Sequence, residues 1–110
     1  MSIVQKQQQF AVAISKLILY ADSIGLPVTL GDAYRDERLH GKMGEKKGYG
    51  AANSCHKLRL AVDVNIIKDG KIAPISDYEK LQKYWRENLG GSEMIANDSN
   101  HFSWQDGPYR

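Results

Sequence analysis

A carboxylate stands in the middle of the most apolar stretch of this chain. The run "LAVDVNII", residues 60–67, has the length and the β-branched side chains of a buried strand, and Asp63 lies at its centre. An unpaired carboxylate in a core is costly, so the fold must bring a partner to Asp63. The ordinary partner is a loop amide or an arginine, here Arg35 or Arg59.

Size and charge limit what this strand can belong to. The chain has 110 residues, which suits a single domain over residues 1–110. Lys and Arg total 15 against 13 Asp and Glu, a net charge of +2. Such a weak positive charge does not predict nucleic-acid binding, although it would suit an acidic polymer such as a bacterial cell wall.

The cysteine count and the N-terminus bear on location. Cys55 is the only cysteine, so no intrachain disulfide can form, and a free thiol fits synthesis in a reducing cytoplasm. The first 25 residues lack the basic and apolar regions of a signal peptide and do not read as a membrane span. We therefore expect a protein that is cytoplasmic on synthesis, without stable membrane association, and monomeric.

Two segments have the periodicity of amphipathic helices. The first covers Ile3–Ile24 and stops at Gly25. The second begins at a capping box formed by Ser76 and Glu79, and ends at Gly90. The apolar positions are Val4, Phe10, Ile14, Leu17, Ile18 and Ala21 in the first helix and Leu81, Trp85 and Leu89 in the second.

The remaining segments predict short strands and one long loop. A short strand is expected within residues 27–35, and a glycine-rich loop over 36–54. After the central run, Asp69-Gly70 predicts a two-residue hairpin that returns through Ile72, and residues 101–104 suggest a last strand. The expected fold class is α+β, a small antiparallel sheet with packed helices.

His56 precedes Asp63 by seven positions, and the pair suggests a metal site. The two residues have opposite parity along a strand, so they can share a site only if the chain turns near residues 57–59. A catalytic zinc commonly takes three protein ligands and one water. His101 is the candidate third ligand, and its competitor His40 lies in the glycine-rich loop, where we expect it to be exposed.

Asp98 stands three residues before His101, close enough across a turn to approach the same water without binding the metal. The alternative is a structural one. "ANDSN" has the composition of a turn, in which an aspartate commonly accepts hydrogen bonds from local backbone amides.

Three blocks of sequence resemble the zinc peptidase family M15. The segment "SCHKLRLAVD" is similar to its Ser-x-His-x6-Asp motif, "GGSEMIANDSNHF" to its closing Gly-Gly and Asp-x-x-His-Phe, and "AYRDER" to its Tyr-Arg segment. The blocks follow the family's order over residues 31–104. Two positions depart from the pattern: Arg59 stands where the family often has Gly, and Glu93 where endolysin members often have Trp.

The resemblance implies a Hedgehog/DD-peptidase-like fold and a set of roles. His56, Asp63 and His101 would bind Zn²⁺, and Asp98 would be the general base. Arg35 would hold the substrate or the developing oxyanion, with Ser54 supporting the site by hydrogen bonding.

The activity that the resemblance implies is hydrolysis of a peptidoglycan stem peptide. The expected bond is L-alanyl-D-glutamate, cleaved by a phage endolysin that reaches the wall after release, through a membrane opened by a phage holin. Three alternatives remain open: a D-alanyl-D-alanine carboxypeptidase, a non-catalytic zinc-containing wall-binding or virion protein, and a cysteine hydrolase using Cys55.

Overall fold

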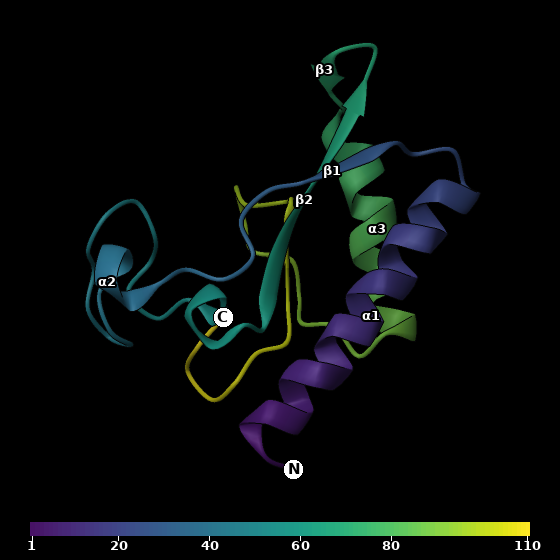
Figure 1. Cartoon of the computed structure of the whole chain (residues 1–110). Coiled ribbons are helices and arrows are strands. Elements are labelled where there is room, and N and C mark those ends of the chain that lie inside the picture. Colours follow the sequence, from purple (N-terminus) through teal and green to yellow (C-terminus); the bar gives the residue numbers. More distant parts are fainter.

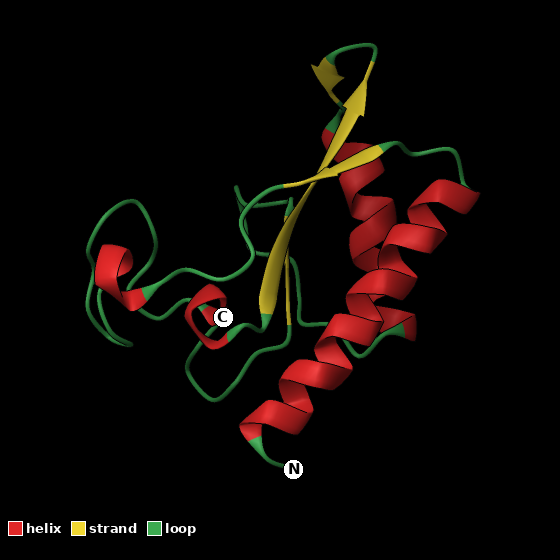
Figure 2. Ribbon diagram, viewed as in Figure 1, coloured by secondary structure: helices red, strands yellow, loops and turns green.

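The computed structural model describes residues 1–110 as an α+β fold, with a small antiparallel sheet and helices packed against it (Figure 1, Figure 2). No helix is long and apolar enough to cross a membrane. The strands are β1 (Val28–Leu30), β2 (Ala61–Lys68), β3 (Lys71–Ile72) and β4 (His101–Ser103). The helices are α1 (Ile3–Ser23), α2 (Glu37–His40) and α3 (Ile75–Asn88), with a 3₁₀ turn, η1 (Cys55–Leu58).

β2 is the axis of the sheet, because each of the other strands pairs with it in antiparallel orientation. β1 pairs with the second half of β2, where Leu30 lies opposite Val64. β4 pairs with the first half, where His101 lies opposite Asp63. The predicted central strand is confirmed, and its first half is the part that receives the C-terminal segment.

The hairpin after β2 is also confirmed. Asp69 and Gly70 both have positive φ, 51° and 74°, as a two-residue turn of this kind requires. The strand expected within residues 27–35 is regular only over β1. Beyond it, the N–H of Gly31 still donates to the carbonyl oxygen of Asp63 at 2.8 Å, so the chain stays beside β2.

Helix α1 matches the predicted helix to within one residue. A capping box closes its N-terminus: the Ser2 hydroxyl accepts the N–H of Gln5, and the Gln5 side chain accepts the N–H of Ser2. One expected core position is wrong. Val4 is 55% exposed, because the first turn of α1 extends past the N-terminal end of β2 (Figure 1).

The start of α3 differs from the prediction. The helix begins at Ile75, its N-cap residue is Pro74, and no side chain forms a hydrogen bond at the cap. The predicted capping box of Ser76 and Glu79 is therefore wrong. Pro74 has φ −64° and ψ 157°, and proline is tolerated at the start of a helix, where its missing N–H would have no intrahelical partner.

Both long helices pack on the same side of the sheet, and the glycine-rich loop and η1 lie on the other side (Figure 1). Trp85 of α3 is fully buried and meets the Phe10 ring of α1 edge-on, with ring centroids 5.7 Å apart. Its Nε1 donates to the carbonyl oxygen of Ser103 at 3.0 Å, which ties α3 to β4. Of the other core positions predicted for this helix, Leu81 is buried, and Leu89, the C-cap residue of α3, is half-buried.

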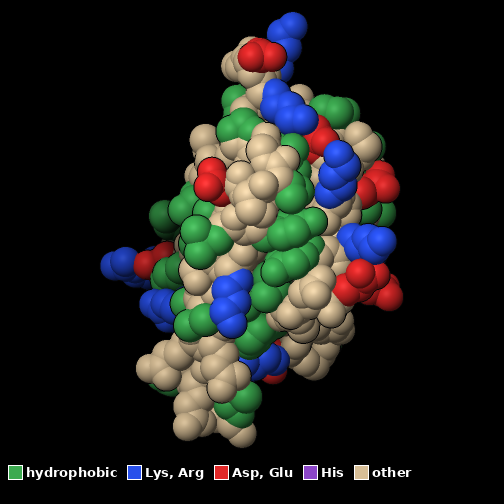
Figure 3. Space-filling view, turned by 90° about the vertical axis from the view of Figure 1, so that its right-hand side faces the viewer, with side chains coloured by type: hydrophobic (Ala, Val, Ile, Leu, Met, Phe, Trp, Pro, Cys, Tyr) green, Lys and Arg blue, Asp and Glu red, His purple; other side chains and the backbone are tan.

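The outer surface of the helix layer also carries hydrophobic side chains. Figure 3 views the molecule from this side and shows a band of them between charged side chains. On α1, Val12 and Leu19 are 54% and 68% exposed. The buried stripe of α1 is as predicted apart from exposed Val4 and half-buried Ile18, but its outer face is not uniformly polar.

The expectation that His40 would be exposed is wrong. The loop over residues 36–54 contains α2 and folds back on itself, so that His40 is only 6% exposed. The imidazole meets the ring of Tyr49 edge-on, with centroids 4.7 Å apart. Gly48 and Gly50 bring the backbone against it, since a Cβ there would lie 3.2 and 3.3 Å from His40 Nδ1.

Gly91 follows α3 and is pressed against Trp85, so that any Cβ at this position would overlap the indole ring. The indole ring cannot easily move aside, because it is buried and donates a hydrogen bond to the carbonyl oxygen of Ser103. We expect Gly91→Ala to lower the free energy of unfolding, measured by urea denaturation, by about 1–3 kcal/mol or more. Gly90→Ala is the control, because nothing lies within 4 Å of a Cβ at that position and its cost comes from a positive φ of 69°. A smaller loss for Gly91→Ala than for Gly90→Ala would contradict the expected overlap.

Candidate metal centre

The segment before β2 makes the bend that His56 and Asp63 need if they are to meet. The hydroxyl oxygen of Ser54 accepts the N–H of His56 at 3.2 Å and opens the turn η1. Arg59 ends η1 in the left-handed conformation, with φ 57° and ψ 33°. The predicted turn is confirmed, and it brings two side chains of opposite strand parity together.

The pairing of β4 with β2 adds His101, directly opposite Asp63. Nε2 of His56 lies 3.1 Å from Oδ1 of Asp63, and Nδ1 of His101 lies 3.2 Å from Nε2 of His56. Nδ1 of His101 lies 3.7 Å from Oδ1 of Asp63. The structure thus brings together the three residues predicted as metal ligands, and both imidazoles are buried.

The spacing of the three donor atoms fits one tetrahedral metal ion. Zinc binds nitrogen and oxygen at about 2.0–2.2 Å, so two ligands of a tetrahedral site lie about 3.3–3.6 Å apart. The three observed separations, 3.1, 3.2 and 3.7 Å, bracket this value. No fourth His, Cys, Asp or Glu joins the group, which leaves one position of a tetrahedron without a protein ligand.

The orientation of His56 suits metal binding. Its Nδ1 lies 2.7 Å from the carbonyl oxygen of Ala33, and only a protonated Nδ1 can make that hydrogen bond. The proton on Nδ1 leaves a lone pair on Nε2, the atom that faces the cluster. A cation between His56, Asp63 and His101 would satisfy all three facing atoms. Without a cation, the N–H at Nδ1 of His101 would donate a hydrogen bond to Nε2 of His56.

Asp63 is held in its charged form. Burial by itself would raise the pKa of this carboxyl, but the imidazoles of His101 and His56 beside its Oδ1 outweigh burial and hold its pKa well below the usual range. Neither a loop amide nor Arg59 is its main partner. The two imidazoles compensate the carboxylate that interrupts the apolar strand.

Arg35 lies beside the cluster with its guanidinium between two carboxylates. Nε lies 3.2 Å from Oδ2 of Asp32, and Nη2 lies 3.9 Å from Oδ2 of Asp63. Nη1 donates to the hydroxyl oxygen of Ser54 at 3.4 Å. The Tyr49 hydroxyl donates to Oδ2 of Asp32 at 2.5 Å, and this bond lowers the pKa of Asp32. The glycine-rich loop is therefore linked to the cluster through Asp32 and Arg35.

Asp32 and Tyr49 were not identified from the sequence. Asp32 precedes Arg35 by three residues, a spacing that could have suggested an ion pair. Tyr49 carries no comparable signal, because it is 17 positions from Asp32 and 71% exposed. Ser54 was identified, but it is buried, so its contacts position His56 and Arg35 and do not reach solvent.

Asp98 lies beside His101 at the edge of the cluster. Its side chain is 48% exposed, and Oδ2 lies 3.8 Å from Nδ1 of His101. The backbone of Asp98 makes the turn, accepting the N–H of His101 and donating to Ile95, each at 3.1 Å. Its carboxylate therefore does not cap the turn, and its contact with the cluster is the 3.8 Å approach to His101.

Cys55 points away from the cluster, although it adjoins His56 in sequence. The thiol is fully buried and donates to the carbonyl oxygen of Trp104 at 3.4 Å. Burial raises the pKa of Cys55 to about 11, so the nucleophilic thiolate is strongly disfavoured at neutral pH.

Lys57 anchors the glycine-rich loop, a role that the sequence did not suggest. Its ammonium group is nearly buried and donates to three backbone carbonyls of the loop, those of Lys42, Glu45 and Ala52, at 3.1, 2.6 and 3.1 Å. Because Lys57 belongs to η1, the loop is tied to the turn that carries His56.

Gln82 positions the opposite side of the cluster. This buried residue of α3 donates through Nε2 to the carbonyl oxygens of Ser99 and His101, both at 2.9 Å. The helix layer therefore fixes the strand that carries His101. The sequence could have indicated that Gln82 is buried, because it follows Leu81 on the apolar stripe of α3.

The two departures from the motif pattern have different consequences. Arg59 adopts a positive φ that glycine adopts without strain, and its guanidinium stacks on the ring of Tyr34, 3.9 Å from the centroid. The turn is thus formed despite the larger side chain. Glu93 is exposed in the segment between α3 and β4 and contacts no member of the cluster.

Comparison of the chain with protein-family models, with curated proteins and with solved structures found no match. The chemistry of the cluster therefore carries the functional proposal.

Proposed function

We propose that this protein is a zinc-dependent peptidase that hydrolyses an amide bond in the stem peptide of peptidoglycan, with L-alanyl-D-glutamate as the bond cleaved. The observation that carries the proposal is the convergence of His56, Asp63 and His101 at separations of 3.1–3.7 Å, with the free carboxylate of Asp98 alongside. A catalytic zinc site commonly has such a set of three protein donors and a fourth position for water.

Each group has a distinct task in the proposed reaction. His56, Asp63 and His101 would hold a zinc ion, which would supply Lewis-acid polarisation and activate water at neutral pH. Asp98 accepts the proton of the attacking water and passes it to the leaving amine. Arg35 supplies positive charge for the developing oxyanion, and Asp32 and Ser54 hold its guanidinium in place.

Two features weigh against the other chemistries. A structural zinc site is normally closed by four protein ligands, and this cluster has three. A cysteine hydrolase needs an accessible thiolate, and Cys55 is fully buried with a raised pKa. Catalysis by the His-Asp-His cluster is therefore the better supported reading.

The substrate class rests on the resemblance of the three sequence blocks to zinc peptidase family M15. The α+β fold with its small antiparallel sheet agrees with a Hedgehog/DD-peptidase-like fold at the level of class. The glycine-rich loop lies beside Arg35 through Tyr49 and Asp32, so it can form one wall of a cleft for an extended peptide. We propose cleavage within the stem peptide and not at a terminal D-alanine.

Metal analysis and digestion of purified peptidoglycan test the proposal. We expect about one zinc per chain, hydrolysis that stops on chelation and returns with added Zn²⁺, and no effect of thiol alkylation. Mass spectrometry of the digest should detect new N-terminal D-glutamate. Release of free D-alanine alone would replace the endopeptidase by a carboxypeptidase, and hydrolysis that survives chelation would contradict the metal mechanism.

A further inference from the structure

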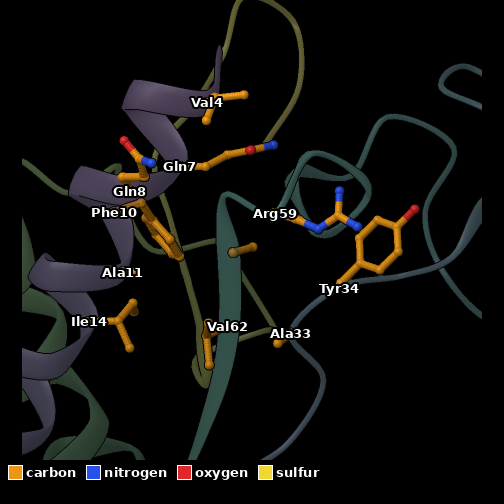
Figure 4. A pocket seen from close by; sticks show the side chains of 11 residues that line it. Val4, Gln7, Gln8, Phe10, Ala11, Ile14, Ala33, Tyr34, Arg59 and Val62 are labelled. Carbon is orange, nitrogen blue, oxygen red and sulfur yellow. The ribbon is translucent and has the colours of Figure 1, made fainter. Parts of the chain in front are cut away.

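We propose that a groove between α1 and β2 is a second binding site, for a small molecule with an aliphatic chain and a carboxylate at one end. Figure 4 shows this groove, with α1 on one side of it and β2, Ala33 and Tyr34 on the other. Its volume is about 490 Å³, within the range of small-molecule sites.

The floor and walls of the groove are apolar. Phe10 and Ala61 are 3% and 1% exposed and form its floor, so a ligand would rest on the hydrophobic core. Val4 and Tyr34, 55% and 42% exposed, stand at its walls. The exposure of Val4, which departs from the sequence prediction, is thus part of an apolar depression. An aliphatic chain would gain about 25 cal/mol for each Å² of apolar surface removed from water.

The charge at the groove defines the other end of the ligand. Arg59 is the one charged residue among the lining side chains. Its guanidinium packs against Tyr34 and forms no direct ion pair, although its charge also acts on the Asp36 carboxylate. The other polar lining residues, Gln7 and Gln8, are uncharged. An apolar chain with an anionic end matches this arrangement, and a cationic end does not.

The groove borders the metal centre but shares no side chain with the cluster. Ala61 and Val62 line the groove and the next residue, Asp63, belongs to the cluster. Ala33 also lines the groove, and its carbonyl oxygen accepts the Nδ1–H of His56. None of the lining residues is a member of the His-Asp-His cluster. The proposed site does not depend on the proposed peptidase activity.

Titration of the full-length protein with decanoate, below its micelle concentration, tests the proposal. We expect saturable shifts of the backbone amide signals of Ala11, Ala33 and Val62 in NMR spectra. Decyltrimethylammonium is the matched probe with the opposite charge and should bind more weakly. Higher salt should weaken decanoate binding, because the ion pair lies at the surface.

Three variants separate the two parts of the proposal. Ala11→Phe fills the groove from an exposed position of α1 and should abolish binding. Arg59→Gln should raise the dissociation constant by about threefold to fivefold, as for an exposed ion pair, and Arg59→Lys should largely restore it. Lys83→Gln removes a charge from the exposed surface of α3 and should change nothing.

Two results would overturn the proposal. If decanoate causes no saturable shifts, or shifts that persist in Ala11→Phe, the groove is not the binding site. If decanoate and decyltrimethylammonium bind equally and Arg59→Gln has no effect, the ligand is not an anion. Zinc content and peptidoglycan hydrolysis should be normal in Ala11→Phe and Lys83→Gln, so failure here is distinguishable from failure of the peptidase proposal.

Discussion

His56→Ala and Asp63→Ala should each abolish zinc binding, measured as metal content after purification and by titration of the metal-free protein. Each change removes one of three donors whose separations are 3.1–3.7 Å, and two remaining ligands cannot hold the ion at its normal affinity. The loss should also appear in stability, because the metal binds only the folded chain. At free zinc a hundred times the dissociation constant, the folded protein gains about 2.7 kcal/mol, and neither variant should show that gain.

His40→Ala is the matched control for this experiment. It also removes a buried imidazole, but His40 packs against Tyr49 in the glycine-rich loop and is not a member of the cluster. We expect it to lower stability while leaving the zinc content at about one per chain. Full zinc content in His56→Ala or Asp63→Ala would contradict the ligand assignment. If only His40→Ala lost zinc, His40 would be assigned as a metal ligand instead.

Asp98→Asn should keep zinc and fold but lose most of the proposed hydrolysis. The amide has the size of the carboxylate but cannot accept a proton from water, and a general base typically contributes about 10²–10⁴-fold to the rate. Because Asp98 is half-exposed and its carboxylate caps no backbone amide, we expect the melting temperature to change little. The measurement is kcat on peptidoglycan for the zinc-loaded variant.

Glu93→Gln is the control for this change. Glu93 is also an acidic residue of the segment between α3 and β4, but it contacts no cluster residue, so its kcat should be close to that of the unaltered protein. Near-normal turnover in zinc-loaded Asp98→Asn would make Asp98 a turn residue only. If Glu93→Gln then lost activity, Glu93 would take its place as the base.

The local features of this chain could be predicted from its sequence, because they depend on neighbours in the chain. The apolar run of β2 and the Asp69-Gly70 turn both follow from short-range side-chain and backbone preferences. The buried stripe of α1 follows from helical periodicity. The need for a bend between His56 and Asp63 follows from strand parity, because in a regular strand the two side chains would point to opposite faces. The start of α3 was missed because Pro74 sets the helix boundary two residues before the apparent capping box.

The candidate metal centre was decided by tertiary structure. His101 could be named as a candidate ligand, but only the antiparallel pairing of β4 with β2 places it opposite Asp63, 38 positions earlier in the chain. No periodicity or spacing encodes such a register, because it results from long-range packing. The contacts that hold the site, from Gln82 to β4 and from Lys57 to the loop, have the same origin.

The burial of His40 and the groove at Arg59 also came from tertiary structure alone. The sequence determined which residues can carry chemistry and on which local elements they lie. Their distances, and the partners that fix their charge, depend on contacts between segments far apart in the chain. Such contacts form only when the whole core is packed, since the loss of chain entropy on closing long loops is offset by burial across the entire domain.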